Sequence, residues 1–141
     1  MKFFLDNLIL ILLACFSGGA LLWQALSSRG PKASPQEATM IINQGKVLIL
    51  DVRESSEFAT GHLRDSRNIP LSELQNRIGE LNKAKSKSVV VVCQSGARAA
   101  KAVPILLAAG FTNVVRLDGG ISAWLAQEMP IVKPAVKEAK A

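Results

Sequence analysis

Apolar and polar positions divide the chain into an uninterrupted apolar segment near the N-terminus and a longer region of short alternating runs. Residues 8–26, LILILLACFSGGALLWQAL, contain no charged residue, and only Ser17 and Gln24 are clearly polar. A helix of this length would extend roughly 28 Å, about the thickness of the bilayer hydrocarbon. The pattern predicts one transmembrane helix, with residues 1–30 forming the membrane anchor and its flanks.

Two other interpretations of this segment involve processing. A cleaved secretory signal would need a basic start and a small-residue cleavage site, but Asp6 offsets Lys2 and the ALS of residues 25–27 matches such a site imperfectly. The LLAC of residues 12–15 is similar to a bacterial lipoprotein site with Cys15 as the lipidated residue, yet the apolar run continues well past it. A spanning helix therefore explains the segment better.

Beyond residue 30, short apolar runs alternate with helical patterns. The runs typical of strands are 47–50, 67–69, 89–92 and 114–117, and the helical patterns cover 36–43, 55–59, 72–81, a stretch ending near 109, and 121–127. Ser34 and Ser72 are expected to cap two of these helices, and residues 30–35 to form a linker. The alternation predicts an α/β domain over residues 31–133, a parallel sheet flanked by helices on both faces. Residues 134–141 are expected to be a flexible Ala/Lys-rich tail.

Charge and composition narrow the possible partners. The net charge is +6, but the lysines cluster at residues 83–87 and in the tail with few aromatic residues among them, so nucleic-acid binding is excluded. Arg29, Lys32 and Lys46 follow the apolar segment, which by the positive-inside rule favours a cytoplasmic domain. Only Cys93 lies outside the apolar segment, and His62 is the one histidine, so we expect no disulfide, metal or cofactor.

The candidate chemistry lies in the loop that follows the most apolar strand. Cys93 stands at the end of that strand and is followed by Gln94, Ser95, Gly96, Ala97 and Arg98, which lead into the next helix. Backbone N–H groups of such a loop can form an anion cradle, and the helix N-terminus adds partial positive charge. These features favour a reactive thiolate, whereas a lone cysteine without such a loop would be read as a small buried apolar residue.

Four motifs in order give the chain a specific resemblance. These are DVRE at 51–54, EFATGHL at 57–63 with NIP at 68–70, CQSGAR at 93–98, and LDGGISAW at 117–124 followed by MP at 129–130. Together they resemble a rhodanese domain over nearly all of residues 35–133. The resemblance implies a sulfurtransferase in which Cys93 takes sulfur from a donor such as thiosulfate, becomes a persulfide, and passes the sulfur to a thiophilic acceptor.

The same resemblance suggests roles for neighbouring residues. Arg98 would hold the loop and steer an anionic donor, whereas Asp51 and Arg53 would brace the fold beside it. Four residues separate Cys93 from Arg98, one fewer than in cysteine-dependent tyrosine phosphatases, so the loop fits sulfur better than a phosphoryl group. The acceptor is a small molecule or a protein, and two alternatives stay open: a membrane-tethered binding module and a sulfur carrier.

Overall fold

The domain is built on a five-stranded parallel sheet. The computed structural model describes the backbone of residues 1–27 and 30–133, and the side chains of residues 1–23 and 30–133. The strand order is β1-β5-β4-β2-β3, and every neighbouring pair is parallel. The strands are β1 Lys32–Ala33, β2 Val47–Asp51, β3 Arg67–Asn68, β4 Ser88–Val92 and β5 Val114–Leu117. The four Val side chains of β4 are fully buried, since this strand lies at the centre of the sheet.

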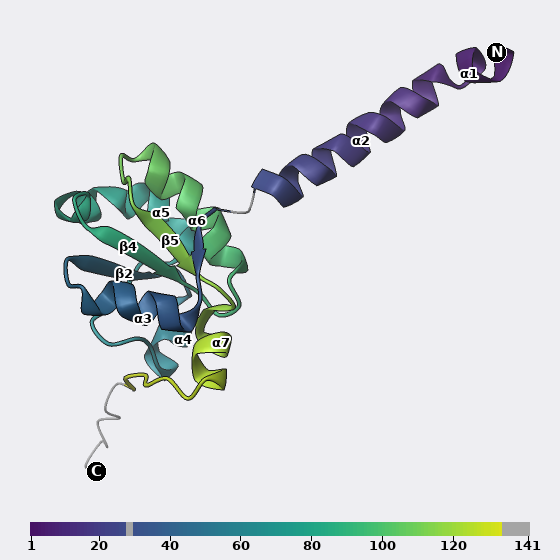
Figure 1. The fold of residues 1–141 in the computed structure, drawn as a ribbon. Helices are drawn as coiled ribbons and strands as arrows, with labels where there is room; N and C mark the ends of the chain where they lie inside the picture. Colours follow the sequence, from purple (N-terminus) through teal and green to yellow (C-terminus); the bar gives the residue numbers. More distant parts are fainter. Residues whose placement is uncertain (28–29, 134–141) are drawn as a thin grey trace, which may run out of the picture.

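Helices cover both faces of the sheet, as the alternating pattern predicted (Figure 1). One face carries α5 Leu71–Arg77, the 3-10 helix η1 Ile78–Ala84 and α6 Ala97–Ala108. The opposite face carries α3 Pro35–Asn43 and α7 Gly120–Ala126, whose Trp124 is buried against Val90 and Val92. A further short helix, α4 Ser55–Thr60, follows β2 at its carboxyl end. Each face thus has its own apolar core, and the parallel α/β prediction is confirmed.

Different hydrogen bonds fix the first residues of α3 and of α5. Ser34 caps α3 as predicted, accepting from the Glu37 N–H at 3.2 Å while the Glu37 carboxylate accepts from the Ser34 N–H. Ser72 is not a cap, because α5 begins one residue earlier and has no side-chain cap. The Leu71 N–H instead donates to the Val52 carbonyl at 3.1 Å, so the backbone that follows β2 fixes this helix start.

Two residues of the expected linker form the edge strand β1. The Arg116 N–H donates to the Pro31 carbonyl at 3.0 Å, and the Asp118 N–H donates to the Ala33 carbonyl at 2.8 Å. An apolar run did not mark this strand, because only Ala33 of its two residues is buried. The pairing brings residues just after the N-terminal helix alongside β5.

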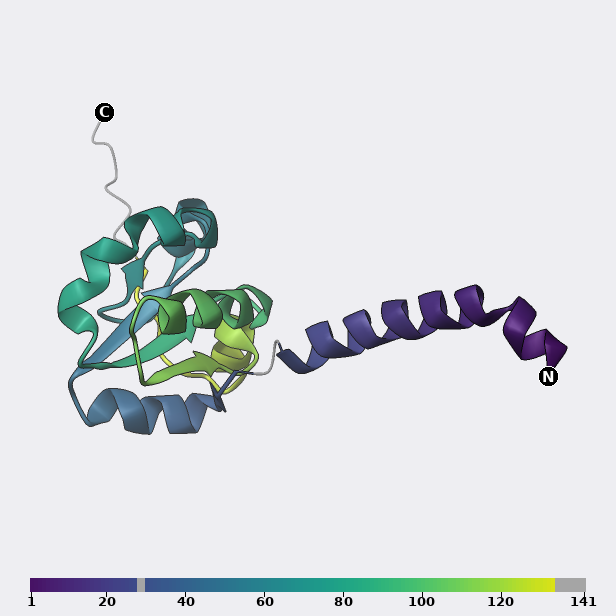
Figure 2. The same ribbon diagram turned by 90° about the horizontal axis from the view of Figure 1, so that it is seen from above.

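The N-terminal segment forms α1 Lys2–Asp6 and α2 Leu8–Ser27. Figures 1 and 2 show α2 extending away from the sheet domain. Large apolar side chains along it are exposed, among them Ile9, Phe16 and Trp23. Within the described residues, no helix has both the length and the apolar character required to cross a bilayer. The structure therefore does not support the transmembrane span predicted for residues 8–26. The predicted tail, residues 134–141, lies outside the described residues.

Candidate active site

The loop after β4 places the Cys93 thiol at the carboxyl end of the central strand. Only 1% of Cys93 is exposed. The Gly96 N–H points to the sulfur and donates to Sγ at 2.9 Å. Gly96 precedes α6 with φ of 105°, a conformation that a side chain would resist. The predicted arrangement of thiol, inward N–H and helix N-terminus is present in the loop geometry.

The N-terminus of α7 supports the loop through the backbone. The Ile121 N–H donates to the Cys93 carbonyl at 2.8 Å, and the Ser122 N–H donates to the Gln94 carbonyl at 3.1 Å. The Gln94 amide also donates to the Ser122 hydroxyl at 3.1 Å. A Cβ on Gly120 would stand only 2.3 Å from the Cys93 carbonyl oxygen. A side chain at Gly120 therefore does not fit between the start of α7 and the loop after β4. Gly120 is the residue that sequence reasoning missed, although it lies within a recognised motif.

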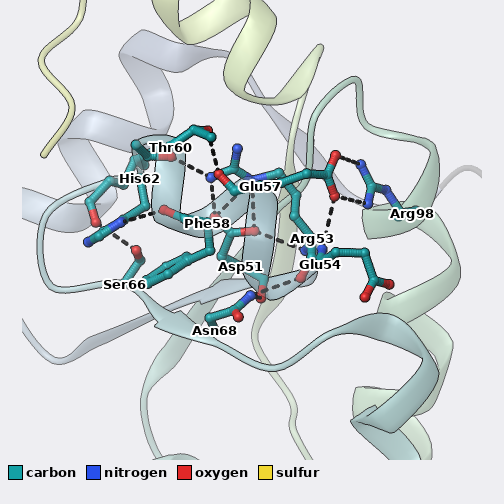
Figure 3. Close-up of polar contacts among 12 residues, drawn as sticks. Asp51, Arg53, Glu54, Glu57, Phe58, Thr60, His62, Ser66, Asn68 and Arg98 are labelled. Atoms are coloured by element: carbon teal, nitrogen blue, oxygen red, sulfur yellow. Dashed lines mark hydrogen bonds and ion pairs between the residues drawn. The ribbon is translucent and has the colours of Figure 1, made fainter. Parts of the chain in front are cut away.

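The charge of Arg98 is paired with the carboxylate of Glu57. Its guanidinium donates to both carboxylate oxygens of Glu57 on α4, at 2.6 and 2.8 Å (Figure 3). These hydrogen bonds lower the pKa of Glu57 from 4.5 to about 2, and they raise the pKa of Arg98 above its ordinary value. The bidentate pair fixes the start of α6 against α4. The loop-holding role expected of Arg98 fits this contact, whereas its charge is already balanced by Glu57.

Asp51 and Arg53 form a buried ion pair behind the loop. Their exposed fractions are 0% and 2%, and Arg53 Nη2 lies 2.9 Å from Asp51 Oδ2. Arg53 also donates to the Gly61 carbonyl at 2.6 Å, and Asn68 donates to the Asp51 and Arg53 carbonyls (Figure 3). The pair thus connects β2 to the end of α4 through the Gly61 carbonyl and to β3 through Asn68.

His62 follows the C-terminal end of α4 and packs against Phe58 of that helix. Its ring stacks on Phe58 with centroids 3.8 Å apart, and Nδ1 lies 3.0 Å from the Phe58 carbonyl oxygen. Across the described ranges, 1–27 and 30–133, no group of three His, Cys, Asp or Glu side chains gathers as metal ligands would.

Comparison with known proteins identifies the class. The family model for the rhodanese-like domain matches residues 34–127. The chain is 38% identical over 88 residues to a sulfurtransferase of Allochromatium vinosum, covering 62% of this chain and 80% of the relative. It is 34% identical over 112 residues to the uncharacterised protein YibN of Escherichia coli K12, covering 79% of this chain and 78% of YibN.

A solved structure shows the same fold. The crystal structure of a rhodanese-related protein from Thermoplasma volcanium is 33% identical, with a TM-score of 0.66, and the match covers 73% of this chain and 98% of that one. The chain belongs to the rhodanese-like domain family. At the level of the family, these likenesses support a sulfurtransferase type of role.

Replacing Gly120 tests the backbone support of the loop. Gly120→Ala should lower the free energy of unfolding by more than about 2 kcal/mol, because φ there is 60° and the added Cβ meets backbone atoms of the loop. Thiol alkylation of Cys93 should also change. Gly79→Ala is the matched control, since its Cβ meets nothing closer than 4.0 Å. Equal urea midpoints for the two variants would contradict the assigned role.

Replacing Glu57 tests the pair with Arg98. Since the folded-state pKa is lowered from 4.5 to about 2, the stabilisation is complete above pH 4.5 and is lost as the pH falls toward 2. Glu57→Gln should therefore cost stability at pH 6, and the difference from wild type should shrink toward pH 3. We expect a cost of about 1 kcal/mol at pH 6, because solvent screens this partly exposed pair. Urea unfolding at both pH values measures it; Glu73→Gln on α5 should not reproduce the pattern.

Proposed function

We propose that Cys93 is the sulfur-carrying residue of a sulfurtransferase that takes sulfane sulfur from thiosulfate or a related donor. The Cys93 thiolate attacks the outer sulfur, a new S–S bond forms, and the S–S bond of thiosulfate breaks with its electron pair leaving on sulfite. An acceptor then attacks the outer sulfur of the persulfide, which returns Cys93 to the thiolate. Charge and sulfur balance in both steps without a cofactor.

The hydrogen bond from the Gly96 N–H to Cys93 Sγ carries this proposal. An N–H that donates to sulfur stabilises a charged sulfur more than a neutral one. The bond lies at the N-terminus of α6, a helix of 12 residues, whose partial positive charge acts in the same direction. The rhodanese-like family and the sulfurtransferase of A. vinosum support the same reaction type.

A non-catalytic role is the second candidate, and the burial of Cys93 is the observation that favours it. With 1% of Cys93 exposed, a donor molecule has little direct access to the sulfur in this conformation. In this alternative the domain recruits a partner. A sulfur carrier, which would pass sulfur between proteins with thiosulfate as an incidental donor, would still use Cys93.

Intact-mass analysis of the full chain decides between catalysis and recruitment. A Cys15→Ser background leaves Cys93 as the one cysteine. After thiosulfate treatment the mass should rise by one sulfur atom, and cyanide should remove it as thiocyanate. Adding Cys93→Ser should abolish the gain. A folded chain that gains no sulfur with thiosulfate or polysulfide would replace the enzyme proposal with the binding module.

We also propose that residues 8–26 hold the domain at a membrane, with the domain in the cytoplasm. Support comes from the large apolar side chains exposed along α2, such as Ile9 (74%) and Phe16 (81%). In water this apolar surface has no apolar partner, whereas a membrane supplies one. The full chain should pellet with membranes and be released by detergent. The double variant Leu12→Lys, Phe16→Lys should move to the supernatant, and a C-terminal reporter fusion should report the cytoplasmic side. Wild-type chain in the supernatant would contradict the proposal.

A further inference from the structure

Arg116 is a cation on β5 that faces the same side of the sheet as the reactive loop. It is two residues from Val114, and Val114 belongs to the apolar core that includes Val91 and Cys93. In the sheet register Arg116 is paired with Lys32 of β1, so the two basic side chains lie on adjacent strands and on one face. Because Lys32 is on the edge strand, the two bases border solvent beside α6.

The guanidinium of Arg116 lies just outside the turn that contacts the thiol. Its Nη1 is 3.9 Å from the position that a Cβ on Gly96 would occupy. Through that glycine, whose N–H donates to Cys93 Sγ, Arg116 lies within about 10 Å of the sulfur. Within the described part of the chain, the Nε atom of Arg116 is buried and has no hydrogen-bond partner. A buried donor without an acceptor is costly, which points to a missing partner.

A cavity adjoins this guanidinium. Its volume is about 570 Å³, and it is lined by Gly30, Pro31, Lys32 and Arg116. The volume suits an organic molecule and exceeds the needs of a single inorganic anion. Lys32 Nζ lies 3.7 Å from Asp118 Oδ2, and both side chains are at least half exposed. This ion pair is therefore weak and leaves the charge of Lys32 largely available.

The two arginines near the loop differ in how their charge is used. Arg98 is held by both carboxylate oxygens of Glu57, so binding a substrate anion there would require breaking two short hydrogen bonds. Arg116 has no ion pair among the residues that the structure describes. The guanidinium of Arg116, rather than that of Arg98, is therefore available to bind an anionic group beside the loop.

We propose that the cavity at Arg116 and Lys32 binds the carboxylate of an organic thiol, and that this thiol is the acceptor of the Cys93 sulfur. This inference rests on the proposed function and adds the class of acceptor to it. In the transfer step the acceptor thiolate attacks the outer persulfide sulfur. A new S–S bond forms on the acceptor, the S–S bond to Cys93 breaks, and its electron pair stays on the Cys93 thiolate. Arg116 is a specificity-determining residue in this step.

A matched pair of acceptors tests the carboxylate. The full chain in the Cys15→Ser background is loaded with thiosulfate, desalted and checked by intact mass before a thiol is added. Loss of the extra sulfur is then timed with 3-mercaptopropionate and with 3-mercaptopropionamide, which differ in charge but hardly in size. We expect the wild type to react about tenfold faster with the carboxylate than with the amide, after correction for each thiol's intrinsic reactivity.

Three variants assign that preference to a residue. Arg116→Met should bring the corrected ratio to about one, and Arg116→Lys should keep part of it, because the charge remains without the guanidinium fork. Arg64→Met removes an equal charge from an 87% exposed side chain and should leave the ratio unchanged. Since each ratio is measured on one protein, partial loss of folded protein cancels.

The outcomes separate this inference from the proposed function. Wild-type protein that loads sulfur but shows no carboxylate preference would overturn the inference and leave the sulfurtransferase proposal intact. The same holds if Arg116→Met keeps the wild-type preference. Wild-type protein that takes up no sulfur at all would instead overturn the proposed function on which the inference rests.

Discussion

The site depends on a backbone contact between the loop after β4 and the N-terminus of α7. Carbonyls of Cys93 and Gln94 accept N–H groups from Ile121 and Ser122. The two segments approach so closely that Gly120 has no room for a side chain. With its carbonyls held in this way, the loop directs an N–H, that of Gly96, toward the sulfur. The buried thiol is therefore positioned by main-chain atoms of two segments far apart in the sequence.

Charge around this loop is distributed in layers. Furthest inside, Arg53 pairs with Asp51 and also donates to the Gly61 carbonyl, which allows two charges to be buried beneath the site. Closer to the loop, Arg98 and Glu57 join α6 to α4. On the other side of the loop, Arg116 keeps an unpaired Nε beside a cavity, within the described structure. Arg53 and Arg98 are thus paired, whereas Arg116 has no ion pair among the described residues and borders a cavity.

The edge strand β1 connects this arrangement to the N-terminal helix. Lys32 and Ala33 follow α2 by a few residues and are hydrogen-bonded along β5, next to Arg116 and Leu117. Gly30 and Pro31, which precede β1, also line the cavity at Arg116.

Much of the fold follows from the sequence because its signals are local. Buried parallel strands require apolar runs, as in the valines of β4, and the Ser34 cap with Glu37 is a contact three residues apart. The strand-loop-helix pattern at Cys93 likewise placed the thiol at the end of a strand. These elements were predicted because neighbouring residues determine them.

Tertiary contacts decided the rest. Glu57 and Arg98 are 41 residues apart, so no spacing rule shows that one neutralises the other. The start of α5 is fixed by a carbonyl beyond β2 instead of by Ser72, and β1 exists only because β5 offers it hydrogen bonds. The sequence by itself determined strands β2 to β5, most of the helices around them and the position of Cys93 at the end of β4. Only the folded chain decided which charges are paired and which remain free, because electrostatic pairing depends on distance in space rather than along the chain.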